Sequence, residues 1–314
     1  MALGILDPTT PTEIYVTPTA SYRPTRLTRS NPLLDSLSLG QMEPIRWKSK
    51  DGKEIEGILV KPVGFQQGRR YPLLTYVHGG PSGVFTLGFE PQLGSAPVPV
   101  QAGPYPIQVF AGMGYAVFMP NPRGSSGYGK AFRKANFKDW GYGDFQDIMT
   151  GIDHLVATGI ADGSQLGIMG WSYGGYMTAW TISQTNRFKA ASVGAGMPNL
   201  FSLHGNTDIP NALSAEYFGA TPWKDREVYQ RSSAIYFADN IRTPTLIQHG
   251  EKDDRVQLSQ AWELYRALEV NDVPREFAVY PRQGHLIIEP KQQKDMLARN
   301  LRWFTKWVRE QPRT

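Results

Sequence analysis

The stretch LGIMGWSYGGYMTAW, at residues 166–180, decides the fold class of this 314-residue chain. It places Ser172 between two glycines, directly after an apolar run typical of a buried strand and directly before a run typical of a helix. In a turn this tight, a side chain at Gly170 or Gly174 would collide with neighbouring backbone, and the serine hydroxyl is exposed at the helix N-terminus. Free backbone N–H groups there can stabilise a developing oxyanion. The pattern therefore predicts a nucleophilic serine on a strand–turn–helix unit.

The composition limits the classes of protein to which the chain can belong. Hydrophobic residues make up 40% of it and charged residues 19%, which is enough for a large core and argues against disorder. The net charge of +5 comes without a dense Lys/Arg run, so we expect no nucleic-acid partner. The absence of cysteine excludes disulfides and thiolate catalysis. Because neither a signal peptide nor a membrane-length apolar run is visible, we expect a cytoplasmic protein without a membrane partner.

Strand-like and helix-like segments alternate along most of the chain. Apolar or alternating runs predict strands at 45–47, 54–60, 73–77, 115–119, 166–169, 190–193, 245–248 and 276–280. Apolar residues three and four positions apart predict helices at 145–156, 258–268 and 297–308. Such alternation predicts an α/β-hydrolase fold, with a mostly parallel central sheet flanked by helices on both faces.

A serine hydroxyl is a weak nucleophile and needs a general base, usually a histidine oriented by a carboxylate. In α/β-hydrolases the chain order is serine, acid, histidine, which favours His285, in a glycine-containing loop after the last predicted strand. Asp253 is the acid candidate, because loops at the carboxyl ends of parallel strands assemble such sites. Asp254 competes with Asp253, and sequence spacing does not separate them. His249 is predicted to have a structural packing role.

The second half of an oxyanion hole is expected in the loop after an early strand. The sequence VHGGP, at residues 77–81, occupies that place. Its glycines let the backbone present an N–H group to a substrate carbonyl without an intervening Cβ atom. His78 is predicted to shape this loop, since it precedes the nucleophile in the chain.

Six short motifs follow one another between residues 78 and 285. They are HGGP at 78–81, NPRGSSGYG at 121–129, GYGDFQD at 141–147, GWSYGGY at 170–176, HGEKDDRV at 249–256 and GH at 284–285. With these motifs, residues 43–310 resemble the catalytic domain of the prolyl oligopeptidase family of serine peptidases, nearest its acylaminoacyl-peptidase and dipeptidyl-peptidase branches.

The resemblance implies a role for individual residues. It implies Ser172 as nucleophile, Asp253 as the residue that orients the base and His285 as the base. It also implies the backbone N–H groups of Tyr173 and Gly80 as oxyanion donors. No cofactor and no metal ion are expected.

Four further residues are candidates for substrate binding. Arg255 matches a position that touches the substrate backbone in some members of the family. Phe201, Tyr217 and Phe218 lie between the nucleophile and the acid and are candidates to line an apolar pocket for the substrate side chain at the cleaved bond.

Three classes of function fit these features. The predicted one is a serine hydrolase that cleaves peptide bonds of short peptides through an acyl-enzyme intermediate. The alternative is a carboxylesterase that acts on small or aryl esters with the same triad. A non-catalytic interaction protein is disfavoured, because Ser172, Asp253 and His285 are all present.

The family resemblance fails at the N-terminus. Members of the family carry an N-terminal β-propeller that covers the active site, whereas about 40 residues precede the hydrolase pattern here, and residues 11–39 resemble the end of a last propeller blade. We therefore predict an N-terminal extension at 1–40 and a catalytic domain at 41–314, either truncated or naturally without a propeller. The uncovered surface predicts a homo-oligomer or an open monomer. The long segment 88–106 is predicted to form a mobile rim beside the active site.

Overall fold

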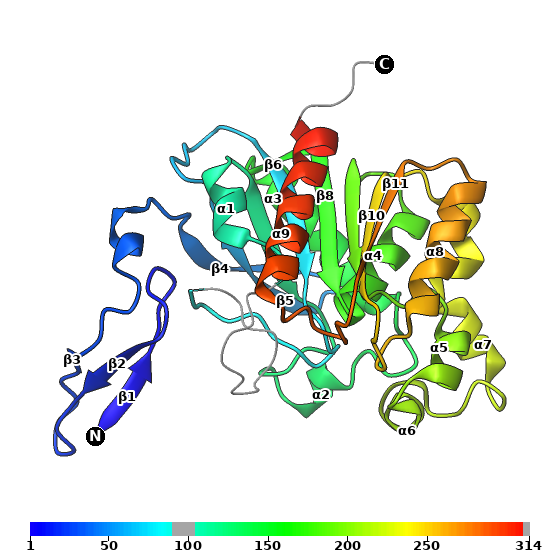
Figure 1. Ribbon diagram of the computed structural model, residues 1–314, viewed down its shortest axis with the longest axis horizontal. Coiled ribbons are helices and arrows are strands. Elements are labelled where there is room, and N and C mark those ends of the chain that lie inside the picture. Colours follow the sequence, from blue (N-terminus) through cyan, green and yellow to red (C-terminus); the bar gives the residue numbers. More distant parts are fainter. Residues whose placement is uncertain (90–103, 310–314) are drawn as a thin grey trace.

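The computed structural model describes residues 1–89 and 104–309, and its centre is a sheet of eight strands in the order β11-β10-β9-β8-β6-β7-β5-β4 (Figure 1). These strands are β4 (Met42–Lys48), β5 (Glu54–Val60), β6 (Tyr71–Val77), β7 (Ala116–Asn121), β8 (Ala161–Trp171), β9 (Ala190–Gly194), β10 (Thr245–Gly250) and β11 (Arg275–Tyr280). β4 and β5 pair antiparallel, as do β5 and β7, and all pairs from β7 to β11 are parallel. The predicted α/β-hydrolase fold is confirmed, and each predicted strand lies in this sheet.

Helices cover both faces of the sheet (Figure 1). The helices of the described chain are α1 (Ile107–Gly112), α2 (Lys130–Arg133), α3 (Gly143–Ala157), α4 (Tyr173–Gln184), α5 (Leu200–Asn206), α6 (Pro210–Ala212), α7 (Arg226–Arg231), α8 (Leu258–Val270) and α9 (Pro290–Phe304). Short 3₁₀ segments lie at Pro32–Ser36 and Ala234–Asn240, and π-helical segments at Leu213–Phe218 and Thr305–Arg309. The predicted helix at 297–308 therefore begins earlier than expected and ends in a π-helical turn.

Alternate residues of the central strands point into two separate cores. In β6, Leu73 and Val77 pack with residues of α3, α4 and α8. Their neighbours Leu74 and Tyr76 pack on the other face, with residues of α1 and α9. This alternation follows from the two-residue period of a strand. Because the strands from β7 to β11 run parallel, their carboxyl ends lie at one edge of the sheet.

The first 37 residues form a separate small sheet beside the main body (Figure 1). Its strands, in the antiparallel order β1-β2-β3, are β1 (Ala2–Ile5), β2 (Glu13–Val16) and β3 (Thr25–Arg26). One buried carboxylate, that of Glu13, accepts hydrogen bonds from the Thr28 hydroxyl and the Ser30 N–H and pairs with Arg26. The division at residue 40 stays a prediction.

Candidate active site

Ser172 stands at the turn between β8 and α4, and the backbone there is strained. Its φ of +62° is in a region that residues other than glycine rarely adopt. A Cβ atom at Gly170 would lie 2.3 Å from the carbonyl group of Gly174, and one at Gly174 would lie 2.0 Å from the Val77 oxygen. Both glycines are therefore needed for the turn, as the sequence predicted, and the Ser172 side chain remains partly exposed.

The loops after β10 and β11 bring an acid and a base to this serine. The Ser172 Oγ lies 2.9 Å from Nε2 of His285, and Nδ1 of His285 lies 2.8 Å from Oδ2 of Asp253. The other oxygen of Asp253 accepts the backbone N–H groups of Arg255 and Val256. The Asp253 side chain is thus buried and fixed on both sides. A connected line of hydrogen bonds runs from carboxylate to imidazole to hydroxyl.

The geometry also separates the two neighbouring aspartates. Asp254 is exposed, whereas Asp253 is 2% exposed and contacts the histidine. His249 is buried next to this acid, with Nε2 2.7 Å from the Val256 carbonyl oxygen and 3.4 Å from Asp253 Oδ2. Burial lowers the pKa of His249, so the ring is neutral at neutral pH. The structure thus places His249 as a packing residue that supports the acid loop.

The early loop at residues 78–81 lies directly against the nucleophile. A Cβ atom at Gly79 would be 3.6 Å from the Ser172 Cβ atom. Gly80 has a φ of +128°, and a Cβ atom there would lie 2.4 Å from the backbone nitrogen of Ser82, so only glycine fits. The buried ring of His78 lies 2.9 Å from the Ser125 Oγ, and burial lowers its pKa to about 4. A neutral, buried His78 shapes the loop, as predicted.

The residue after the nucleophile is held by a carboxylate that the sequence did not point to. The Tyr173 hydroxyl donates to Oδ2 of Asp144 at 2.5 Å, and Oδ1 of Asp144 accepts the N–H groups of Gly141 and Phe145. Burial raises the pKa of Asp144 to about 7. The first N–H of α4, that of Tyr173, has no acceptor within the helix and is available to an oxyanion. In the sequence, Asp144 stood out only as part of the GYGDFQD motif at 141–147, without a role of its own.

Two more contacts near the turn were missed by sequence reasoning. The Trp171 indole Nε1 donates to the backbone oxygen of His285 at 2.8 Å. The Tyr105 hydroxyl donates to the backbone oxygen of Gly170 at 2.8 Å and lies 3.2 Å from that of Ser192. Each joins residues far apart in the chain, and no local pattern signals them.

A buried ion pair supports the next loop of the site. Asp147 is fully buried and accepts from the backbone N–H and the guanidinium of Arg123, with the shortest side-chain distance at 2.7 Å. The same guanidinium also binds Asp51 at 3.0 Å. Arg123 belongs to the NPRGSS loop, whose Ser125 contacts His78, so this network reaches the loop at 78–81.

The predicted substrate-binding residues occupy different environments. Arg255 is exposed and forms a bidentate ion pair with Asp208, at 2.6 and 3.1 Å. Phe201 and Tyr217 are partly buried against the core. Phe218 is fully buried between Trp140 and Tyr229, at ring-centroid distances of 5.0 and 4.5 Å. It therefore offers no surface to a substrate in this structure, which corrects its assignment to a pocket wall.

Other features bound what the site contains. Most of the predicted rim, residues 90–103 of segment 88–106, lies outside the described residues. No group of three or more potential metal ligands occurs in the part of the chain that the structure describes. No helix among residues 1–89 and 104–309 is long and apolar enough to span a membrane.

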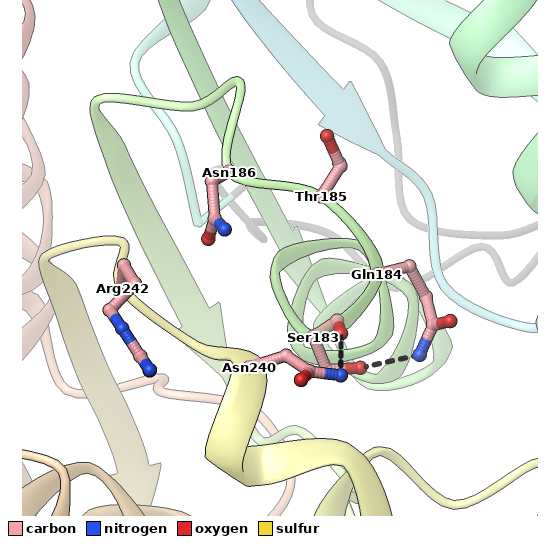
Figure 2. A pocket seen from close by; sticks show the side chains of 6 residues that line it. All are labelled: Ser183, Gln184, Thr185, Asn186, Asn240 and Arg242. Carbon is pink, nitrogen blue, oxygen red and sulfur yellow. Dashed lines mark hydrogen bonds between the residues drawn. The ribbon is translucent and has the colours of Figure 1, made fainter.

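A polar pocket of about 300 Å³ lies at the far end of α4 (Figure 2). Its lining residues are Ser183, Gln184, Thr185, Asn186, Asn240 and Arg242. Within it, Gln184 donates to the Ser183 hydroxyl at 3.0 Å and Asn240 to the Ser183 carbonyl at 3.4 Å. Since α4 begins beside Ser172, this pocket lies a helix length of about 18 Å from the turn and contains none of the predicted site residues.

A serine at a strained strand–helix turn, on a mostly parallel sheet, defines the class of α/β-hydrolases. Residues 103–311 match the family model described as the prolyl oligopeptidase family. The chain belongs to this family of serine peptidases.

Relatives and solved structures agree with that assignment. The chain is 30% identical over 305 residues to the "Uncharacterized peptidase YuxL" of Bacillus subtilis, covering 97% of this chain and 44% of that protein. It is 29% identical to dipeptidyl-peptidase 5 of Schizosaccharomyces pombe, covering 87% and 39%. The chain thus spans less than half the length of these relatives.

Two structural neighbours cover nearly the whole chain. The acylaminoacyl peptidase of Pyrococcus horikoshii has a TM-score of 0.86 at 28% identity and covers 98% of this chain and 48% of that one. A puromycin-hydrolyzing peptidase of Mycobacterium tuberculosis has a TM-score of 0.86 at 25% identity and covers 100% and 46%.

Proposed function

We propose that this chain hydrolyses peptide bonds, with Ser172 as nucleophile, His285 as general base and Asp253 as the residue that orients the base. The observation that carries the proposal is the continuous hydrogen-bonded line from Asp253 Oδ2 through the His285 ring to Ser172 Oγ, with steps of 2.8 and 2.9 Å. The buried Asp253 carboxylate also accepts hydrogen bonds from two backbone N–H groups, which supports a single orientation of the imidazole.

The chemistry follows from these positions. An Nδ1–H bond to Asp253 fixes the histidine tautomer that leaves Nε2 free to accept the Ser172 proton. The serine oxygen attacks the substrate carbonyl, and the N–H groups of Tyr173 and Gly80 stabilise the resulting oxyanion. His285 then gives the proton to the leaving amine, which leaves an acyl group on Ser172. Water, activated by the same base, releases the acid and restores the hydroxyl.

Short peptides are the proposed substrates. The family includes proteins named as acylaminoacyl and dipeptidyl peptidases, and both names describe removal of small units from peptide ends. The exposed Arg255 beside the acid loop is positioned to contact a substrate backbone or carboxylate, if its pair with Asp208 opens. Such an exposed pair is weak enough to exchange partners, at roughly 0–1 kcal/mol.

The test compares leaving groups on one enzyme. Peptide p-nitroanilides, with free and with acetylated amino ends, are assayed beside p-nitrophenyl acetate and butyrate, with Ser172→Ala as the blank. We expect Ser172-dependent turnover of the anilides. Turnover of the esters alone, with anilides at the level of the blank, would instead identify a carboxylesterase. Near-native turnover by Ser172→Ala would exclude the mechanism itself.

A further inference from the structure

The side chains on both sides of Ser172 are held by hydrogen bonds. Tyr173 donates to Asp144, and Trp171 donates to the backbone of His285. Trp171 is 2% exposed, and its indole Nε1 donates to the His285 backbone oxygen at 2.8 Å. The ring is fixed from its other side, because a Cβ atom at Gly194 would lie 2.1 Å from the Trp171 Cε3 atom. The indole therefore has one orientation, set by β9, and points its N–H at the histidine loop.

The His285 loop is also joined to the acid loop, because the Gln283 carbonyl oxygen accepts the Lys252 N–H at 2.7 Å. Between β11 and α9 the chain is irregular, and Gln283 ties the loop to itself by accepting the N–H groups of Ile288 and Glu289. The ring of His285 is held by Asp253, but the position of the ring also depends on the backbone that carries it. The Trp171 bond joins that backbone directly to the residue before the nucleophile. A shift of Trp171 is therefore expected to shift the His285 backbone as well.

We propose that Trp171 is a positioning residue that keeps the His285 Nε2 atom in register with the Ser172 Oγ atom. This inference rests on the proposed roles of Ser172 and His285. A displacement of about 1 Å between reacting groups lowers rates by roughly 100-fold, so one well-placed hydrogen bond on the base loop has a measurable effect on catalysis.

The chain offers a matched control for this bond. Trp180, in the same helix–turn unit, is equally buried at 2% exposure, but its indole Nε1 has no hydrogen-bond partner in the described part of the chain. Trp171→Phe removes ring area and a hydrogen bond, whereas Trp180→Phe removes ring area alone. We expect kcat to fall by about 10- to 100-fold in Trp171→Phe, with KM changed by less than about threefold. Trp180→Phe should keep kcat within about threefold of the wild-type value.

A second measurement separates this inference from the proposed function. The low-field proton NMR signal of the His285 Nδ1–H, assigned by its loss in His285→Gln, reports on the base loop without turnover. We expect it to shift or broaden in Trp171→Phe and to stay unchanged in Trp180→Phe. Equal kcat losses in the two variants, or an unchanged signal and kcat in Trp171→Phe, would overturn the positioning role. Near-native activity of Ser172→Ala would overturn the proposed function. The NMR signal would still test whether the Trp171–His285 hydrogen bond positions the base.

An independent feature lies at the opposite edge of the sheet, where β6, β7 and β8 begin. A pocket of about 460 Å³ is lined there by three arginines, Arg69, Arg70 and Arg309, and by no carboxylate of the described residues. Most arginines of the described chain form ion pairs, but none of these three lies within 4.0 Å of a carboxylate in the residues that the structure describes. Three arginines without a carboxylate in the described lining distinguish this pocket from the one in Figure 2, whose one lining arginine is Arg242.

Two of these arginines are held in place by the protein. The Arg69 guanidinium lies 5.3 Å from the centre of the Tyr71 ring. That of Arg309 lies 5.6 Å from the Tyr115 ring and donates to the Met113 backbone oxygen at 2.6 Å. Cations held this way lose little freedom when an anion binds, and the planar guanidinium fits phosphate oxygens in pairs. We infer that this pocket binds an oligophosphate group, because its described lining carries three cations and no carboxylate to offset them.

Calorimetric titration at low ionic strength tests the arginine pocket with inorganic pyrophosphate, ATP and adenosine. We expect saturable binding of pyrophosphate and ATP but not of adenosine, and Arg69→Gln should weaken it by about tenfold. Arg23→Gln removes one exposed arginine that does not line this pocket and forms no ion pair with the described residues, and it should change the affinity by less than about twofold. Tighter binding of ATP than of pyrophosphate would identify a nucleotide as the ligand, and equal binding a free oligophosphate. Absence of saturable binding, or equal losses in both variants, would overturn the site.

Discussion

Two regions of the molecule differ in which side chains they bury and which they expose. One is the edge of the main sheet around Ser172, and the other is the N-terminal segment 1–37. Around the serine, ionisable groups are buried and bonded to one another, as for Asp144 and Asp253. The N-terminal segment also buries one carboxylate, that of Glu13, but its large apolar side chains are exposed; these are Met1, Leu6, Ile14, Val16, Tyr22, Leu27, Leu33 and Leu37. A buried polar network is costly to disturb, because each lost partner leaves a desolvated group. The comparison therefore predicts large effects of substitution at the first region and small ones at the second.

The largest effect is expected from the base. His285→Gln removes the group that accepts the Ser172 proton, while a side chain of similar length keeps the loop filled. We expect kcat to fall by roughly 10⁴ or more, with a normal circular dichroism spectrum. The assay is steady-state hydrolysis of the best peptide anilide. A fall in kcat of less than about tenfold would show that another group acts as the base. It would also contradict the expectation that substitutions around Ser172 have the larger effect.

The two adjacent aspartates sharpen the comparison within a single loop. Asp253→Asn replaces the acceptor of the His285 N–H and disturbs the tautomer, so kcat should fall by roughly 10³- to 10⁴-fold. Asp254→Asn changes an exposed carboxylate and should leave kcat within about threefold of the wild-type value. Both are measured with the same substrate. The reverse ranking would mean that Asp254 is the acid that orients the base.

Asp144 predicts a pH effect on stability. Burial raises its pKa from 3.8 to about 7, so between these values the folded protein keeps a proton that the unfolded chain has lost. The free energy of unfolding therefore contains a contribution that falls as the pH rises through this window, on the order of 4 kcal/mol over about three pKa units. Asp144→Asn removes the titration.

The measurement is urea unfolding of the wild type and of Asp144→Asn at several pH values. His78, whose pKa burial lowers to about 4, gives a slope of the opposite sign and is present in both proteins, so the difference between them isolates Asp144. We expect the wild type to lose stability relative to the variant from pH 4 to pH 7. A pH-independent difference would show that Asp144 is ionised throughout.

How much the sequence could predict depends on the range of the contacts. The turn at Ser172 was predictable because its requirements are local. A Cβ atom at Gly170 would lie 2.3 Å from backbone, and one at Gly174 would lie 2.0 Å from backbone. The Asp144–Tyr173 and Trp171–His285 bonds join residues 29 and 114 positions apart, and no periodicity or turn rule brings such pairs together.

Side-chain direction was the other limit of the sequence. Asp253 and Asp254 have the same chemistry and adjacent places in one loop, and only the folded backbone decides which carboxylate turns inward. Phe218 shows the same limit, because an apolar residue near a site has the same pattern whether it lines a pocket or packs in the core. The motifs and the alternation of strand-like and helix-like segments were enough to predict the family and the sheet. The hydrogen bonds between side chains could be identified only in the folded structure.

The smallest effect on catalysis is expected in the N-terminal segment. Glu13 is its buried carboxylate, and its pKa is lowered to about 2, chiefly by the hydrogen bond from Thr28. A lowered pKa means that its stabilising contribution is present above the ordinary value of 4.5 and is lost as the pH falls toward about 2. Glu13→Gln removes the charge that pairs with Arg26 and should make segment 1–37 more sensitive to limited proteolysis at neutral pH. Among the described residues, none of the hydrogen bonds around Ser172 involves this segment, so kcat/KM should change by less than about twofold. A loss of tenfold or more would show that the small sheet supports the active site.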